Sequence, residues 1–335
     1  MSETPIARGL DETSARAADE EAAILEQEAL VGRPFNQRMA TTRILAELWN
    51  DKVGFLGAAF LLVLVLCAVF APLVAPYDPA AQSLADRLTP PALSDGGSWA
   101  HPLGTDNLGR DILSRLIYGA RVSLVVGAVV VLVSGAFGVG MGLIAGYRGG
   151  RPGRWIMGVC DTQMAFPGLL LALIVLAIVG PSLGAVIVVL AINNWMVYAR
   201  VTRGTVLSVK ETPYVEAAEI AGCRPRRVMA RHILPNLTAV LATLAVLEFA
   251  NVVLAEAALS FLGLGVQPPA TSWGLDVANG REYIFDAWWL VTFPGMAIAL
   301  TVLAINVVAS WLRVVADPLE REKRFAAGVM TQAHA

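Results

Sequence analysis

The chain has 335 residues, of which 56% are hydrophobic and 16% are charged, with a formal net charge of −2 and a mean hydropathy of +0.62. Soluble globular chains usually hold about 45–50% apolar and about 25% charged residues, so this composition excludes an ordinary soluble domain and indicates contact with lipid. The near-neutral charge excludes general attraction to nucleic acid, and Cys67, Cys160 and Cys223 are too few and too far apart for a disulfide framework or a zinc cluster.

The two ends of the chain are predicted to be cytoplasmic tails, residues 1–50 and 321–335. The first 40 residues are polar and contain no apolar run of the roughly 7–15 residues that a cleaved secretory signal needs. We assign no function to either tail.

Apolar stretches long enough for six membrane crossings lie between the tails, because a helix needs roughly 20 apolar residues to span a bilayer core of about 30 Å. Gly180-Pro181-Ser182 divides the longest stretch into the third and fourth spans. The predicted spans are 53–74, 122–146, 155–199 as two spans, 236–264 and 288–312. We therefore expect an all-α, polytopic helical bundle with six transmembrane helices in residues 51–320, and both termini on one side.

The distribution of Lys and Arg gives the orientation. With a cytoplasmic N-terminus, all of the 25 basic residues fall inside except Arg87, Arg110, Arg115, Arg121 and Arg281. The positive-inside rule therefore predicts that both termini and the Arg-rich loop at residues 206–235 are cytoplasmic.

The segment between the first two spans, residues 76–121, is then extracytoplasmic. Gly104 and Thr105 predict a turn that caps a helix beginning near Asp106. His101, Asp106 and Asp111 raise the question of a metal site, but neither their spacing nor their ligand types are diagnostic. We expect a structural outer helix and no metal.

Glycines recur in the second span at intervals of three or four residues, which allow helices to cross closely in lipid. They are Gly127, Gly135, Gly138, Gly140 and Gly142. We expect this stripe to pack within the bundle or against a partner subunit.

The loop at residues 206–235 has the pattern of two short helices. Thr212-Pro213 is typical of an N-cap followed by a first-turn proline, and Gly222 is a residue that readily ends a helix. Pro225 can begin the second helix, and Pro235 disfavours helix in the residue before it, so we expect a turn there.

Two functions fit this loop. The small side chains of Ala217, Ala218 and Ala221 would let a cytosolic partner approach the backbone closely. The alternative is an amphipathic hairpin at the membrane surface, with its positive charges facing lipid headgroups. Spacing alone does not decide between them.

A family resemblance favours the first function, docking of a cytosolic partner protein. Glu216-Ala217-Ala218, then Gly222, then His232-Ile233-Leu234-Pro235 resemble the EAA loop of permease subunits in ATP-binding-cassette (ABC) importers. In that family this loop docks into a groove of the cytosolic ATPase subunit. The family usually has an apolar residue where this chain has His232, although the dipeptide and oligopeptide branch often has His there. The resemblance implies an ATPase-coupling set of Glu216, Ala217, Ala218, Gly222, Arg227, His232 and Pro235.

Two further stretches resemble the C-type permease of dipeptide, oligopeptide and nickel importers: HPLGTDNLGRD at residues 101–111 and LSFLGLGVQPP at residues 259–269. The resemblance covers roughly residues 40–320 and implies the MetI-like fold of type I importers, in a bacterial inner membrane. It also implies a second homologous permease subunit, two cytosolic ATPase subunits, an extracytoplasmic solute-binding protein and surrounding membrane lipid. It does not identify the cargo.

Polar residues inside the spans are candidates for the translocation path, because such residues usually face a cavity or a partner. Glu248 and Glu256 share a face of the fifth span, with Asn251 near Glu248, and Asn194 lies in the fourth span. A carboxylate on the path suits the cationic end of a peptide, whereas hydrogen bonding between helices is the alternative. The candidates are Glu248, Asn251 and Asn194, and for Asp161 we expect capping or an ion pair.

The chain carries no phosphate-binding GxxxxGK[ST] loop, because Asp, Val and Glu precede Lys52, Lys210 and Lys323. We therefore expect a non-catalytic subunit that binds no cofactor, with ATP used by partner ATPase subunits. An ion-coupled secondary transporter of small solutes is the alternative. It predicts inverted repeats and broken helices, and the sequence gives no sign of either. A structural membrane scaffold would leave the coupling loop unexplained.

Overall fold

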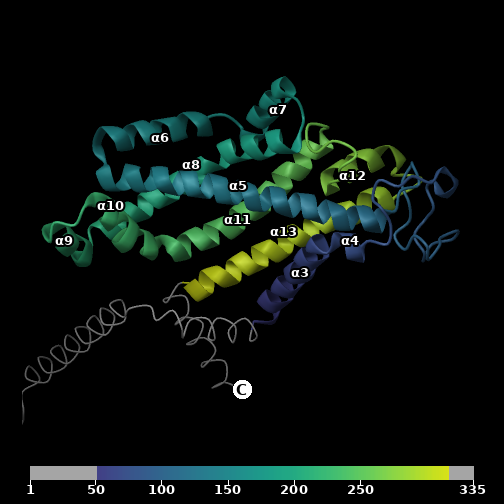
Figure 1. The fold of residues 1–335 in the computed structure, drawn as a ribbon, viewed down its shortest axis with the longest axis horizontal. Coiled ribbons are helices and arrows are strands. Elements are labelled where there is room, and N and C mark those ends of the chain that lie inside the picture. Colours follow the sequence, from purple (N-terminus) through teal and green to yellow (C-terminus); the bar gives the residue numbers. More distant parts are fainter. Residues whose placement is uncertain (1–50, 317–335) are drawn as a thin grey trace, which may run out of the picture. The chain divides into compact units, whose positions relative to one another are not determined.

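Helices build the part of the chain that the computed structural model describes, residues 51–316 (Figure 1). Both predicted tails, residues 1–50 and 321–335, lie outside this range. The long helices are α3 (Lys52–Val69), α5 (Ile112–Arg148), α6 (Gly150–Met164), α7 (Gly168–Val179), α8 (Leu183–Lys210), α11 (Leu234–Phe261) and α13 (Trp289–Ala316). Shorter ones are α4 (Ala71–Val74), α9 (Pro213–Ile220), α10 (Pro225–Val228) and α12 (Trp273–Gly280).

Within the described residues, five helical stretches are long and apolar enough to cross a membrane. They are Lys52–Val69, Ile112–Arg148, Leu183–Lys210, Pro225–Phe261 and Trp289–Val315. The pair α6 and α7 passes the same test together, which brings the number to six if this bent pair is one span. The prediction of an all-α membrane bundle is confirmed, and the predicted count of six depends on that pair.

The third span is broken, a feature that was not predicted. α6 and α7 meet at an angle of 82° across residues 165–167. Pro167 explains the break, because proline has no N–H to donate and disfavours helix in the residue before it. The signal was present in the sequence as Phe166-Pro167.

One predicted helix start was wrong, and two long helices extend past the predicted spans. α5 begins at Ile112, not near Asp106, since the Asp106 carboxylate accepts hydrogen bonds from the N–H groups of Leu108 and Arg110 and closes a turn there. Asp111 is the N-cap of α5. Residues 112–121 of the predicted outer segment therefore belong to α5, and residues 206–210 of the predicted coupling loop belong to α8.

The glycine stripe of the second span packs α5 against α8. A Cβ on Gly138 would lie 2.2 Å from the carbonyl oxygen of Trp195, and a Cβ on Gly142 would lie 2.6 Å from that of Ala199. Only glycine permits an approach this close. The predicted packing within the bundle is confirmed at these positions, whereas Gly140 faces open space.

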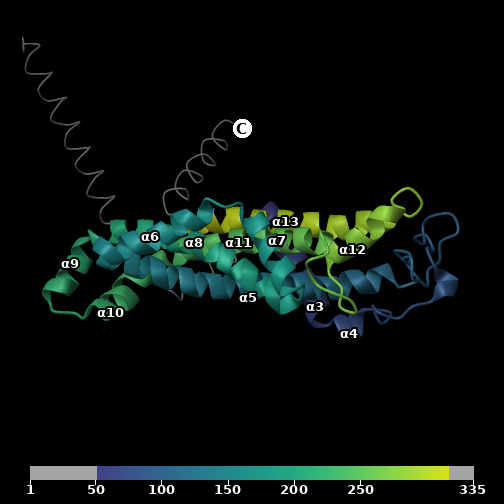
Figure 2. The same cartoon turned by 90° about the horizontal axis from the view of Figure 1, so that it is seen from above.

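The connecting segments gather at opposite ends of the helices. α9 and α10 lie at one end, while α12 and the loops on either side of it lie at the other, together with residues 75–111 (Figures 1 and 2). The long helices α5, α8 and α11 run between the two ends, so they connect the Arg-rich loop with the opposite end.

Candidate functional site

The segment at residues 212–235, which we call the elbow, joins α8 to α11 and contains most of the predicted coupling residues. α9 begins at Pro213, with Thr212 in the N-cap position. The Thr212 hydroxyl donates to the carbonyl oxygen of Val209 (2.5 Å) and makes no cap hydrogen bond to α9. The predicted helix start is confirmed, but a side-chain cap does not stabilise it.

Gly222 ends α9 in the predicted way. Its φ is +76°, in the left-handed region that favours glycine. The N–H of Gly222 donates to the carbonyl of Glu219 (2.9 Å), and the N–H of Cys223 donates to that of Ala218 (3.1 Å). These two bonds are a Schellman motif, which satisfies the last carbonyls of the helix and fixes the direction of the chain after it.

The expected turn before Pro235 is absent, because residues 225–261 form one helical stretch. A π-turn at Met229–Ile233 connects α10 with α11, and the N–H of Leu234 donates to the carbonyl of Met229. This wider turn accommodates the ring of Pro235, which would clash with a carbonyl four residues back in a regular α-helix. The elbow is thus continuous with the fifth span.

An apolar core and side-chain hydrogen bonds hold the elbow in place. Fully buried Val215, Val228 and Ile233 of the elbow pack with Val206 of α8 and Leu237 of α11. Asn236 Nδ2 donates to the Tyr214 hydroxyl (2.8 Å) and to the carbonyl of His232 (2.7 Å), which ties α9 to the start of α11. These contacts make α8, the elbow and α11 one packed unit.

The predicted coupling residues lie on the surface of this unit. Those that are exposed are Glu216, Ala217, Gly222, Arg227 and Pro235, and those that are partly buried are Ala218 and His232. Ile220 was not predicted, although it is 81% exposed at the end of α9 beside Gly222. An apolar side chain this exposed outside the spans is a candidate contact for a protein partner.

The carboxylates of the fifth span lie in two different environments. Glu256 is fully buried and accepts hydrogen bonds from the hydroxyls of Ser123 (3.0 Å) and Ser260 (2.7 Å), so it links α11 to α5. Glu248 is 7% exposed, and Asn251 Nδ2 lies 3.4 Å from its Oε1. Asn251 itself is exposed, and Asn194 on α8 is partly buried.

Side-chain amides fasten the broken third span to α8. Gln163 Nε2 donates to the carbonyl of Ile192 (2.5 Å), and Asn193 Nδ2 donates to that of Gly168 (2.8 Å). Trp195 Nε1 in turn donates to Gln163 Oε1 (3.0 Å). Irregular backbone inside a membrane span requires such partners.

The predicted ion pair of Asp161 is confirmed. Its Oδ1 lies 2.5 Å from an Nη atom of Arg200 on α8, and the side chains are 67% and 48% exposed. The pair therefore bridges α6 and α8 on the surface of the described chain.

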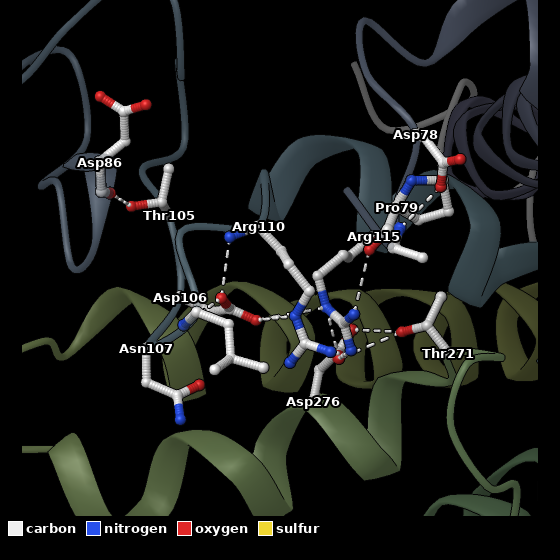
Figure 3. A network of polar contacts seen from close by, with 12 residues as sticks. Asp78, Pro79, Asp86, Thr105, Asp106, Asn107, Arg110, Arg115, Thr271 and Asp276 are labelled. Carbon is white, nitrogen blue, oxygen red and sulfur yellow. Dashed lines mark hydrogen bonds and ion pairs between the residues drawn. The ribbon is translucent and has the colours of Figure 1, made fainter. Parts of the chain in front are cut away.

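The opposite end of the bundle holds a buried charge network (Figure 3). Arg110 Nε donates to Asp106 (2.6 Å), and Arg115 donates to Asp276 and to the carbonyl of Pro79 (3.2 Å). Burial raises the pKa of Asp276, while the Arg115 guanidinium opposes that rise. The network joins residues 75–111 to α5 and α12.

The residues weighed as metal ligands have partners within the protein. His101 Nδ1 lies 3.0 Å from Asp111 Oδ1, while Asp111 Oδ2 accepts from the N–H of Ser114 (2.8 Å) at the start of α5. Asp106 pairs with Arg110. Their arrangement is that of a helix cap and a turn.

Comparison with known proteins identifies relatives for most of the chain. Residues 138–322 match the family described as the binding-protein-dependent transport system inner membrane component, and residues 41–91 match the N-terminal TM domain of oligopeptide transport permease C. The di/tripeptide transport system permease protein DppC of Pseudomonas aeruginosa (strain UCBPP-PA14) is 45% identical over 278 residues, which are 82% of this chain and 92% of the relative. The dipeptide transport system permease protein DppC of Escherichia coli (strain K12) is 46% identical over 278 residues, 82% of this chain and 93% of the relative. A putative peptide transport system permease protein of Brucella suis biovar 1 (strain 1330) is 45% identical over 264 residues, 78% and 86% of the two chains.

Proposed function

This chain belongs to the family of binding-protein-dependent transport system inner membrane components, and we propose that its elbow is the surface through which a cytosolic ATPase drives it. As a member of that family, the chain is a multi-pass permease subunit of an ABC importer. The observation that carries the proposal is the exposure of Glu216, Ala217 and Gly222 on an elbow with its own packed core.

The chemistry of the elbow surface suits a protein groove. Glu216 is an exposed charge in the first turn of α9, and Ala217 next to it leaves the backbone accessible. Ile220 adds an exposed apolar contact near the Schellman turn. A small, rigid, partly apolar projection is typical of a helix that docks into a groove.

The assembly that we propose contains a second homologous permease, two ATPase subunits and an extracytoplasmic binding protein. Each ATPase would bind the elbow of one permease. When the two ATPase subunits close on ATP, they would move the elbows as rigid bodies and switch the pore from an inward-facing to an outward-facing state. The elbow must contact the two ATPase states with different free energies, because a ligand shifts an equilibrium only by its differential affinity. Both termini of this chain would then be cytoplasmic.

The proposed cargo is a di- or tripeptide or a related small solute, as the names of the relatives indicate for those proteins. We propose that Asn251 and Asn194 face the path, with Glu248 buried beneath Asn251 and hydrogen-bonded to it. Polar contacts of this kind would let a solute pass without holding it strongly.

We further propose that this subunit is non-catalytic and binds no cofactor. The segment Gly180-Pro181-Ser182-Leu183-Gly184 has the GxSxG spacing of a serine nucleophile. Ser182, however, accepts a hydrogen bond from the N–H of Ala185 (3.2 Å) as the N-cap of α8. A helix cap accounts for this serine without catalysis.

The test uses the complete transporter in proteoliposomes. Glu216→Lys reverses an exposed charge at the proposed contact, so it should abolish co-purification of the ATPase and ATP-driven uptake while membrane insertion stays normal. Glu211→Lys is the matched control, since Glu211 is also exposed in this loop but precedes α9. Normal ATPase association in Glu216→Lys would overturn the proposal, and uptake without any ATPase would favour the ion-coupled alternative.

A further inference from the structure

The exposed faces of two helices differ in chemistry. α3 exposes apolar side chains, among them Val53, Leu56 and Leu62, as a lipid-facing helix should. The exposed residues of α6 are Gly150, Arg151, Pro152, Arg154, Trp155, Gly158, Val159, Asp161, Thr162 and Met164. Charged and polar side chains in a span usually face a cavity or a partner, not lipid, so this face of α6 is turned toward water or protein.

The ion pair lies within its helices near the cytoplasmic side of the predicted spans, since Arg200 directly follows the stretch 155–199. At 1.5 Å per residue, Asp161 is about 10 Å along α6 from Arg154, and Arg200 is about 15 Å along α8 from Lys210. The break at residues 165–167 begins one turn after Asp161. Irregular backbone at membrane depth is tolerated where it is buried in protein or lines a water-filled cavity.

An open groove lies along α6, although neither Asp161 nor Arg200 lines it. It has a volume of about 960 Å³, and its lining includes Arg154, Gly158, Thr162, Gln163 and Phe166. The groove is thus formed by α6, the break and the start of α7, and Thr162 within it is the neighbour of Asp161.

From this arrangement we propose that Asp161 and Arg200 form a cargo subsite on the translocation path, which takes a zwitterionic solute by its ammonium and carboxylate groups. The inference rests on the proposed function of the chain as a peptide-class permease. In the empty path the two side chains neutralise each other. When a zwitterionic solute binds, the ion pair between Asp161 and Arg200 is exchanged for two ion pairs with the solute. Asp161 pairs with the solute's ammonium group and Arg200 with its carboxylate, so no charge is left unpaired.

The pair is complementary to a zwitterion and not to a purely anionic group. A purely anionic headgroup would find one guanidinium beside the repelling Asp161 carboxylate, whereas a zwitterionic headgroup would match both charges as a solute does, so access of a water-soluble thiol reagent to this face distinguishes the two. A purely structural ion pair would gain little in this place, since exposed pairs contribute almost nothing to stability. The high exposure of both side chains instead leaves their remaining hydrogen-bonding capacity free to meet a solute.

The experiment compares uptake with ATP hydrolysis in proteoliposomes that hold the complete transporter. The probe is labelled Ala-Ala, delivered with the binding protein. Asp161→Asn and Arg200→Gln should each lower uptake per ATP hydrolysed by roughly ten- to a hundredfold, the effect of losing one charge-assisted hydrogen bond. Subunit assembly and ATPase activity stimulated by the binding protein should stay normal. Arg313→Gln, at the cytoplasmic end of α13, is the control and should behave as the wild type.

Unchanged uptake per ATP in both variants would overturn the subsite. Failure of the wild-type transporter to take up the probe would instead contradict the proposed function, so the two failures are distinguishable. If either variant loses assembly, labelling of an engineered cysteine decides the question.

For that measurement Cys67, Cys160 and Cys223 are replaced by Ala, and Thr162→Cys is compared with Leu132→Cys in the assembled transporter. Leu132 is 70% exposed on α5 and apolar, as a lipid-facing residue should be. A membrane-impermeant thiol reagent should modify Thr162→Cys rapidly and block uptake, while Leu132→Cys stays unmodified. Equal resistance at both positions would place this face of α6 against lipid or the second permease and overturn the subsite.

Discussion

Arg115 on α5 and Asp276 on α12 form a buried ion pair across 161 positions of sequence, with Nε 3.0 Å from Oδ1. Their side chains are 3% and 6% exposed. Arg115 also donates to the carbonyl of Pro79, and the Thr271 hydroxyl donates to the Asp276 carboxylate (3.0 Å). The Arg115 guanidinium on α5 therefore holds both the segment around Pro79 and helix α12, through Asp276.

Removing one member of this pair should be costly. Arg115→Met leaves the Asp276 carboxylate buried without its cation, which should lower stability by about 3–5 kcal/mol, measured as thermal unfolding of the purified protein in detergent. The double variant Arg115→Met/Asp276→Leu should be more stable than Arg115→Met, because no charge is then left unpaired. Ser83→Ala is the control, since it removes only an exposed hydrogen bond to Asp86. Equal unfolding temperatures for Arg115→Met and Ser83→Ala would contradict the assignment.

Gly222 offers a test of close approach that separates backbone strain from contact. Gly222 and Gly263 both end helices in Schellman motifs with φ near +80°, and neither would bring a Cβ within 4 Å of another group. Asn tolerates this conformation, so Gly222→Asn and Gly263→Asn should both cost roughly 1 kcal/mol or less. Only Gly222→Asn should reduce co-purification of the ATPase, because only its side chain projects into the proposed contact. A similar loss from both variants would attribute the effect to the helix ends alone.

The packing of α5 on α8 predicts opposite results for two neighbouring glycines. Gly142→Ala places a Cβ 2.6 Å from the carbonyl of Ala199, so it should force the helices apart and lower stability by about 1–3 kcal/mol. Gly140→Ala meets nothing within 4 Å and should be neutral or stabilising by up to about 1 kcal/mol, since Ala favours helix over Gly. Thermal unfolding of the two variants measures the contrast. Destabilisation of Gly140→Ala to the same extent would mean that its open face is covered in the assembled transporter.

The two glutamates of the fifth span should respond differently to the loss of their carboxylates. Glu256→Leu leaves the hydroxyls of Ser123 and Ser260 without an acceptor, so it should reduce stability by roughly 1–3 kcal/mol. Glu248→Gln keeps an acceptor for Asn251 but removes the acid, so it should leave folding intact and alter uptake if the acid lies on the path. Uptake in proteoliposomes and thermal unfolding distinguish these effects. Unchanged uptake in Glu248→Gln would leave this residue with a packing role alone.

The sequence was sufficient for the features that depend on local chemistry. Apolar length identified the spans, and Pro213 and Gly222 marked the ends of α9 because their backbone preferences act within one turn. The interpretation of Pro235 was wrong, since a π-turn stabilised by distant packing absorbed the proline.

Features that depend on pairing between helices could not be predicted. Nothing in the sequence around Arg115 identifies Asp276 as its partner, and Gln163 gives no local sign that it bonds the backbone of α8. The bend at Pro167 was visible as a proline within an apolar run. Its 82° angle could not be predicted, because the hydrogen bonds that join Gln163 and Gly168 to α8 exist only in the folded chain.

The uninterrupted helical stretch from Pro225 to Phe261 has a mechanical consequence. A rod of that many residues measures about 55 Å, so tilting it by about 10° about one end displaces the other by roughly 10 Å. Leverage of this size needs no flexible joint and no relay of small rearrangements. A force that the ATPase exerts on the Pro225 end of this rod would displace the Phe261 end, on the other side of the membrane, at the same time.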